Sequence, residues 1–342
     1  FFSRAPMQPP HLLMQSPRLA PTELQDITRQ PSGEANADLD PRSSPPTTPC
    51  SPLTKLRRGY RPWCEPCSLK HKLLEASSAP PHSVKRNILT GYRPLTTDSR
   101  ELVASLCYLH NESGNIYTHL GALVVFLLLA VHHFCIADLQ LSLSDKLISL
   151  LFFLSVMTCY GLSAYYHLHL CNTYPVYQQA YACDLMGIVA CIVGSFYIGL
   201  YLGYACLPQW QWFYMALITV EVVPLLYIVS QEKLRKKQKV VVPFFVAVVA
   251  TGLVPAMHFT LFVDHPLRLT MMQAIYSMFG LYLLGVLFYL LEIPESWYPG
   301  RFDYILHSHQ VWHMFVFMAP LCEYLGALVV MSHGPLGPLC PT

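Results

Sequence analysis

Seven long apolar stretches occupy most of this sequence after residue 115 and limit what it can fold into. Most of them lack Asp, Glu, Lys and Arg entirely. A helix of about 20 residues crosses the ~30 Å hydrocarbon core of a bilayer, and β-barrel strands would be about half as long. We therefore predict an all-α membrane protein, a bundle of seven transmembrane helices. The stretches cover about 116–136, 147–170, 180–204, 209–230, 240–263, 269–291 and 304–331.

The composition also favours lipid as the solvent of this chain. Only 12% of the residues are charged and 53% are hydrophobic, whereas a soluble domain usually carries about 25% charge. The net charge of +2 gives no electrostatic reason to expect nucleic acid as a partner. The twelve cysteines are scattered, which is not the pattern of a disulfide-rich domain. Most soluble classes are thereby excluded.

The first 85 residues differ from the rest of the chain. They hold fifteen of the 28 prolines, and their apolar runs are short and never periodic. Such a segment cannot bury enough apolar surface to offset the entropy of ordering. We predict a disordered Pro-rich tail over 1–85, a seven-helix domain over 86–331 and a short C-terminal segment over 332–342. The tail is interpreted as a solvated linker, with docking of cytosolic partners as the alternative.

A short helix is expected just before the first apolar stretch. In Arg100–His110 the side chains of Leu102, Leu106 and Leu109 share one helix face. An amphipathic helix of this kind can lie along a membrane surface. We therefore predict an interfacial helix over this segment.

The distribution of Lys and Arg predicts the orientation in the membrane. Cytosolic segments are enriched in these residues. Twenty of the 22 Lys and Arg lie in the N-terminal segment and in the loops after the fourth and sixth stretches, five of them in Lys233–Lys239. Only Lys146 and Arg268 fall on the other side. We predict a cytosolic N-terminus and an extracytosolic C-terminus.

Five polar side chains inside the apolar stretches fall at one depth in this orientation. Polar groups within a span are costly and are therefore functional candidates. Ser163 and His167 lie near the cytosolic end of the second stretch, and Asp184 lies in the first turns of the third. His309 and His313 lie in the first three turns of the seventh. All five are expected in the half of the bundle next to the cytosol.

The spacing of these residues points to zinc chemistry. His309 and His313 are four residues apart and share a helix face, as two imidazole ligands of one zinc often do. With His167 as a third ligand, a fourth tetrahedral position stays open for water, which is typical of catalytic zinc. Asp184 could hold or deprotonate that water. Ser163, one turn before His167, could donate a hydrogen bond to a developing oxyanion.

Hydrogen bonding between helices is the alternative interpretation of the three histidines, and spacing alone does not decide between the two. His169 and His307 point to other helix faces and are interpreted as interfacial. His119 is at the right depth, but helix packing explains its presence. His258 and Glu221 lie in mid-span and receive no role.

Four ordered sequence blocks resemble those of the progestin and adipoQ receptor (PAQR) family, over about residues 86–331. The blocks are Ile88–Leu89–Thr90–Gly91–Tyr92–Arg93–Pro94; Asn111–Glu112–Ser113–Gly114–Asn115–Ile116–Tyr117–Thr118–His119; Ser163 with His167 and then Asp184; and Pro299–Gly300–Arg301–Phe302–Asp303–Tyr304 with Ser308–His309–Gln310–Val311–Trp312–His313. The resemblance implies seven helices, a cytosolic N-terminus and a zinc ion held by His167, His309 and His313, with Asp184 acting through water.

Distant kinship of this family with alkaline ceramidases suggests hydrolysis of a sphingolipid amide. The first hypothesis is thus a zinc-dependent hydrolase whose substrate, ceramide or a related membrane lipid, enters from the bilayer. Members of the family are also described as receptors and as Golgi-resident anchors. A lipid-sensing receptor, or a Golgi or endomembrane scaffold with structural zinc, is therefore the alternative. The Golgi or the plasma membrane is the expected location.

Overall fold

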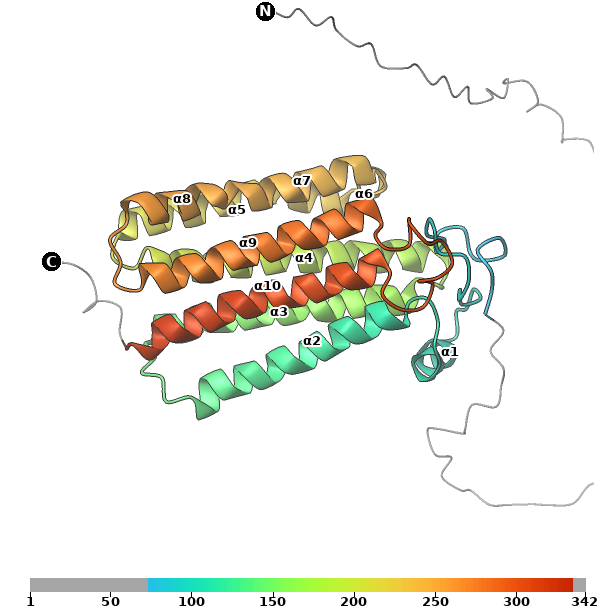
Figure 1. Cartoon of the computed structure of the whole chain (residues 1–342), viewed down its shortest axis with the longest axis horizontal. Coiled ribbons are helices and arrows are strands. Elements are labelled where there is room, and N and C mark those ends of the chain that lie inside the picture. The colour runs from blue at the N-terminus through green and yellow to red at the C-terminus, as the bar shows by residue number, and fades with distance from the viewer. Residues whose placement is uncertain (1–72, 335–342) are drawn as a thin grey trace, which may run out of the picture. The chain divides into compact units, whose positions relative to one another are not determined.

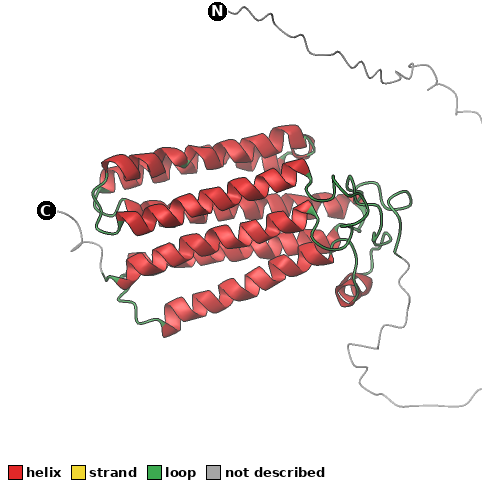
Figure 2. Ribbon diagram, viewed as in Figure 1, coloured by secondary structure: helices red, strands yellow, loops and turns green. Residues whose placement is uncertain are grey.

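The structure, a computed structural model, describes residues 73–334, and seven of its helices are long and apolar enough to cross a membrane. The predicted seven-helix class is confirmed, and Figure 2 shows no strand in the described part of the chain. The spans are α2 (Ser113–Val131) with the π-helical turn His132–Ile136, α3 (Leu143–His169), α4 (Tyr174–Gly203), α5 (Pro208–Ser230), α7 (Gln238–Thr251) with α8 (Leu253–Phe262), α9 (Arg268–Leu291) and α10 (Ser308–Ser332).

The spans contact one another in chain order, and the contacts close into a ring because α10 contacts both α9 and α2. Figure 1 shows the spans running along a common axis. Helix α10 also contacts α4 across the ring. In α3, α4 and α10, 50% of the most apolar 18-residue segment is buried inside the bundle. In α9 only 11% of that segment is buried. The candidate site residues of the sequence analysis all lie on these three central helices. Which end of the bundle faces the cytosol stays a prediction from the Lys and Arg distribution.

Local sequence explains where several helices begin and break. Ser142 caps α3 in a capping box with Asp145, and Pro208 opens α5, where a fixed φ suits a first helical position. The fifth span breaks between α7 and α8. Pro255, in the first turn of α8, has no N–H to donate to the carbonyl of Thr251, four residues earlier, so one helical hydrogen bond is missing at the break. The Thr251 hydroxyl donates to the Glu221 carboxylate at 2.6 Å, which gives that mid-span acid a partner.

The seventh span begins later than predicted, at Ser308 and not at 304. Leu306 has a left-handed backbone conformation with a φ of 64°, which ends any helical path before it. The Glu295 carboxylate accepts a hydrogen bond from the Ser308 N–H at 2.7 Å and so caps the new helix. His309 therefore lies in the first turn of α10.

The predicted interfacial helix is shorter than expected. Helix α1 covers only Ser99–Ala104, followed by a 3₁₀ turn over Ser105–Cys107. The Ser105 hydroxyl donates to the Leu102 carbonyl at 2.7 Å and accepts from Arg93 at 2.8 Å, and such side-chain bonds compete with a continuing helix. Leu102 is buried, whereas Leu109 lies beyond the helix and is exposed. The three leucines therefore do not share one face.

The predicted end of the tail at residue 85 is wrong, because residues 73–85 pack onto the bundle. Leu74 and Tyr92 pair through two backbone hydrogen bonds of 2.7 and 3.1 Å. His82 Nε2 lies 2.9 Å from the carbonyl oxygen of Asn172, in the loop between α3 and α4. The rest of the predicted tail, residues 1–72, and residues 335–342 of the predicted C-terminal segment lie outside the described residues.

The close approach of α3 and α4 depends on Gly194. A Cβ atom at this position would lie 2.7 Å from Ser155 Cβ, which no rotation of the serine relieves. We expect Gly194→Ala to lower the free energy of unfolding by about 1–3 kcal/mol through overpacking. Gly161→Ala is the matched control, because nothing lies within 4 Å of its added Cβ. Thermal unfolding of both variants in detergent tests this, and equal stabilities would contradict the close approach.

Candidate metal centre

Three imidazoles converge where the end of α3 meets the first turns of α10. The ligand atoms of His167, His309 and His313 all lie within 4.8 Å of one another. The Nε2 atoms of His167 and His309 are 3.2 Å apart. His167 and His313 are buried, and His309 is partly exposed. Spacing and depth in the sequence predict these three residues as one set, and the fold brings their ligand atoms together.

The distance between these nitrogens suits a shared zinc ion. Tetrahedral ligands with Zn–N bonds of 2.0–2.1 Å have nitrogens about 3.3 Å apart. The proton positions also fit. His167 Nδ1 lies 2.7 Å from the Glu112 carboxylate, and His313 Nδ1 lies 3.2 Å from the Asn115 carbonyl oxygen. Both oxygens are acceptors, so we assign the ring protons to Nδ1, which leaves the Nε2 lone pairs for a metal.

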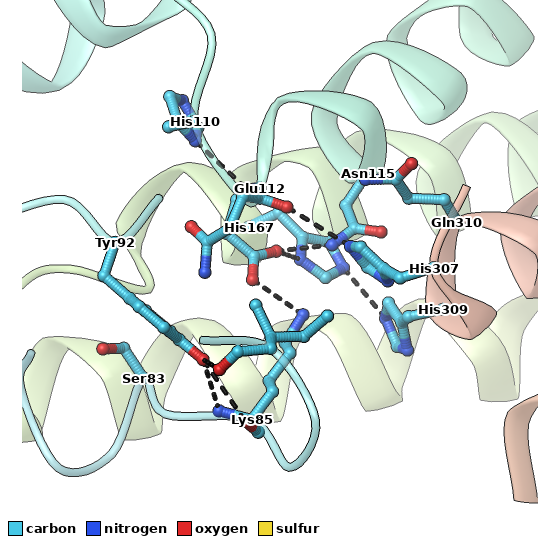
Figure 3. Close-up of polar contacts among 12 residues, drawn as sticks. Ser83, Lys85, Tyr92, His110, Glu112, Asn115, His167, His307, His309 and Gln310 are labelled. Atoms are coloured by element: carbon cyan, nitrogen blue, oxygen red, sulfur yellow. Dashed lines mark hydrogen bonds and ion pairs between the residues drawn. The ribbon is translucent and has the colours of Figure 1, made fainter. Parts of the chain in front are cut away.

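Glu112, to which no role was assigned from the sequence, contacts the candidate ligand His167. It directly precedes α2 and is 1% exposed. Besides His167, its carboxylate contacts Lys85 Nζ at 2.7 Å and accepts from Asn115 Nδ2 at 2.5 Å (Figure 3). Burial alone would raise the pKa of the Glu112 carboxyl, but Lys85 and His167 outweigh it and hold that pKa well below its usual range. The signal available in the sequence was a carboxylate at the end of a charge-free span.

Other histidines surround the three without joining them. The His119 ring stacks on His313, with centroids 3.7 Å apart and planes at 11°, as the packing interpretation predicts. His307 was expected to be interfacial, but it is 1% exposed, and its Nε2 lies 3.3 Å from the Asn111 carbonyl oxygen. Burial lowers the pKa of His307 to about 4, so this ring is neutral. His169 is partly exposed, with Nδ1 2.9 Å from the Tyr165 carbonyl oxygen.

Asp184 and Ser163 are buried side chains on α4 and α3. Asp184 is 9% exposed, and its carboxylate is under the electrostatic influence of His167 and of the Ser163 hydroxyl. Ser163 is 3% exposed and lies one turn before His167 on α3. Asp184 is outside the set of mutually close ligand atoms, so it is available for a role other than ligation.

Comparison with known proteins identifies the family. A family model described as haemolysin-III related matches residues 107–324, which is more than half of the 342 residues. The chain belongs to the haemolysin-III related family. The matched region includes every candidate site residue and Glu112, whereas Lys85 precedes it.

Relatives in this family carry the names that the resemblance suggested. Progestin and adipoQ receptor-like protein 1 of Caenorhabditis elegans is 29% identical over 260 residues, which cover 73% of this chain and 58% of that protein. The adiponectin receptor protein of Drosophila melanogaster is 29% identical over 243 residues, covering 69% and 54%. Progestin and adipoQ receptor family member 3 of Homo sapiens is 26% identical over 271 residues, covering 76% and 86%. The chain thus spans a little over half the length of the first two relatives. With its seven apolar helices and these relatives, it is an integral multi-pass membrane protein.

Proposed function

We propose that this chain binds zinc through His167, His309 and His313 and hydrolyses the amide of a membrane lipid, ceramide or a related sphingolipid. The observation that carries the proposal is the arrangement of the donor groups. Three imidazoles converge, with the Nε2 atoms of His167 and His309 3.2 Å apart and the Nε2 atoms of His167 and His313 free of a proton, and two buried groups, Asp184 on α4 and Ser163 on α3, lie outside the ligand set.

The roles of the chain's own residues follow from their chemistry. A bound zinc ion polarises a carbonyl and lowers the pKa of water. Asp184 accepts the proton of the attacking water and returns it to the nitrogen of the leaving amine. Ser163 donates a hydrogen bond to the carbonyl oxygen as negative charge develops there. The products are a fatty acid and a sphingoid base.

The exposure of His309 supports access from the lipid. It is the partly exposed member of the three, and the ring of Tyr289 on α9 lies 5.5 Å from it. Helix α9 is the least buried span. In the predicted orientation this side of the site lies in the cytosolic leaflet, near the depth of a lipid amide below its headgroup.

A lipid-sensing receptor, or a Golgi or endomembrane scaffold, with structural zinc is the second candidate. Two cavities in the described part of the chain are not lined by the three histidines. The larger, of about 450 Å³, lies against His82 and Tyr174, and the smaller, of about 10 Å³, against Arg93 and Glu112. In this alternative the N-terminal tail binds cytosolic partners. The names of the relatives favour this candidate, because all three relatives named above have the word receptor in their names.

Metal analysis of the purified full-length protein, combined with a ceramide turnover assay, tests the proposal. The hydrolase predicts stoichiometric zinc and release of fatty acid that stops when a chelator removes the metal. Stoichiometric zinc without turnover of any ceramide would favour the receptor or scaffold. Protein that binds no zinc would contradict both.

A further inference from the structure

We propose that Glu112 and Lys85 are positioning residues for the metal ligand His167, so that the segment preceding the first span forms part of the metal centre without supplying a ligand. This inference rests on the proposed zinc site. It concerns two residues to which the sequence analysis assigned no role.

The two oxygens of the Glu112 carboxylate contact different partners, the metal ligand His167 and Lys85 in the segment before α2. Oε2 accepts from His167 Nδ1 at 2.7 Å and from Asn115 Nδ2 at 2.5 Å, and Oε1 faces Lys85 Nζ at 2.7 Å. Figure 3 shows Glu112 between Lys85 and the His167 ring, with His309 on the far side of that ring. The orientation of the imidazole is thus set by a carboxylate that is itself held on more than one side.

A carboxylate in this position acts on the metal through the imidazole. It fixes the tautomer with the proton on Nδ1, orients the ring and makes Nε2 a better electron donor, which typically changes metal affinity 10–100-fold. Glu112 is 1% exposed, and a buried carboxylate without a counter-charge is costly. Lys85 supplies that charge, so its contribution to the metal is expected to pass through Glu112.

Hydrogen bonds hold the loop that carries Lys85 in place. The backbone N–H of Lys85 donates to the Tyr92 hydroxyl at 3.0 Å, and that hydroxyl donates to the Ile88 carbonyl at 3.0 Å. Asp303, in the loop before α10, accepts from the N–H of Thr90 at 2.8 Å. The loop that carries Lys85 is thereby tied to the loop that leads into the other two metal ligands.

The same segment also holds the backbone of His167. Arg93 is 4% exposed and donates to the carbonyl oxygens of His167 at 2.7 Å and Leu168 at 3.0 Å. These are carbonyls of the last turn of α3, which lack partners within the helix. Residues 85–93 therefore fix both the backbone of His167 and, through Glu112, its ring.

Zinc affinity of the full-length protein tests the inference, measured by competition with a chelator of known affinity. We expect Glu112→Gln to weaken zinc binding about 10-fold or more, because the amide still accepts from Nδ1 but carries no charge. Lys85→Met keeps the aliphatic stem and should weaken binding by a smaller factor. The double variant should bind no more weakly than Glu112→Gln alone if Lys85 acts through Glu112. The visible spectrum of the Co²⁺-loaded protein should change in both single variants.

Glu292→Gln is the matched control. Glu292 accepts from Asn87 at 2.6 Å and pairs with Arg86 at 3.9 Å. Removing its charge therefore perturbs the same segment without touching His167. Unchanged zinc affinity and Co²⁺ spectra in both Glu112→Gln and Lys85→Met would overturn the inference and leave the zinc site standing. An equal loss in Glu292→Gln would also overturn it, because general loosening would then explain the effect. Wild-type protein that binds no zinc would instead refute the proposed function. Should Glu112→Gln fail to fold, Lys85→Met carries the test alone.

Discussion

Replacing both His309 and His313 by alanine is expected to remove bound zinc from the purified protein and to lower its thermal stability. The two side chains supply two of the three converging nitrogens, and one imidazole does not retain the metal. Zinc that binds only the folded state stabilises it, by about 4 kcal/mol when free zinc exceeds the Kd a thousandfold. The metal also ties α10 to α3, so its loss should be visible as a lower unfolding midpoint. Elemental analysis and thermal unfolding in detergent measure both effects.

His169→Ala is the matched control for this variant. His169 lies two residues from His167 on the same helix, is partly exposed, and packs on Tyr165 at a centroid distance of 4.1 Å. It should keep its zinc. Full retention of zinc in the His309→Ala, His313→Ala double variant would refute the metal centre.

Asp184→Asn is expected to keep zinc and the fold but to lose most turnover. The amide is nearly the same size as the carboxyl group but does not accept the proton of the attacking water. General-base assistance is typically worth about 10²–10⁴-fold in rate, so a loss in that range is expected. Because Asp184 lies outside the set of mutually close ligand atoms, metal content should not change.

Ser163→Ala should cost less than Asp184→Asn, about 10²-fold, the effect of removing one donor to a developing oxyanion. Asp264→Asn is a control for the chemical change itself, because the Asp264 side chain is exposed in the loop between α8 and α9. Loss of zinc in Asp184→Asn would make the carboxylate a ligand and favour a structural site. A cellular phenotype that persists in Asp184→Asn, with zinc-replete wild-type protein turning over no ceramide, would favour the scaffold.

The membrane spans could be predicted closely because each depends on its own composition. A run of apolar residues long enough to cross a bilayer forms a helix wherever it lies in the bundle. Two of the errors fall where distant residues decide a boundary, whereas α3 and α4 begin four and six residues earlier than predicted at local signals, a capping box and a proline. Glu295 caps α10 at Ser308, and Arg93 holds Ser105 where the predicted interfacial helix stops. Neither contact has a local signal.

Part of the candidate site could also be predicted from local sequence, and part depends on contacts between distant residues. The i, i+4 spacing of His309 and His313 makes them neighbours on any helix, and the depth argument adds His167, Asp184 and Ser163. The spacing did not exclude hydrogen bonding between helices as the reason for these histidines. Two observations favour the metal: the 3.2 Å separation of the His167 and His309 nitrogens, and the oxygen acceptors at Nδ1 of His167 and His313. Both depend on how α3, α10 and the start of α2 pack together.

Sequence alone determined that this chain is a seven-helix membrane protein and which three imidazoles share a depth, because length, apolar content and helical periodicity are local properties. Only the tertiary structure decided that residues 73–85 belong to the folded domain. It also decided that Glu112 contacts His167 and that Lys85 pairs with Glu112. Lys85 and Glu112 are 27 positions apart and Glu112 and His167 are 55 apart. Contacts over such separations depend on how loops return to the end of the bundle, which no periodicity in the sequence encodes.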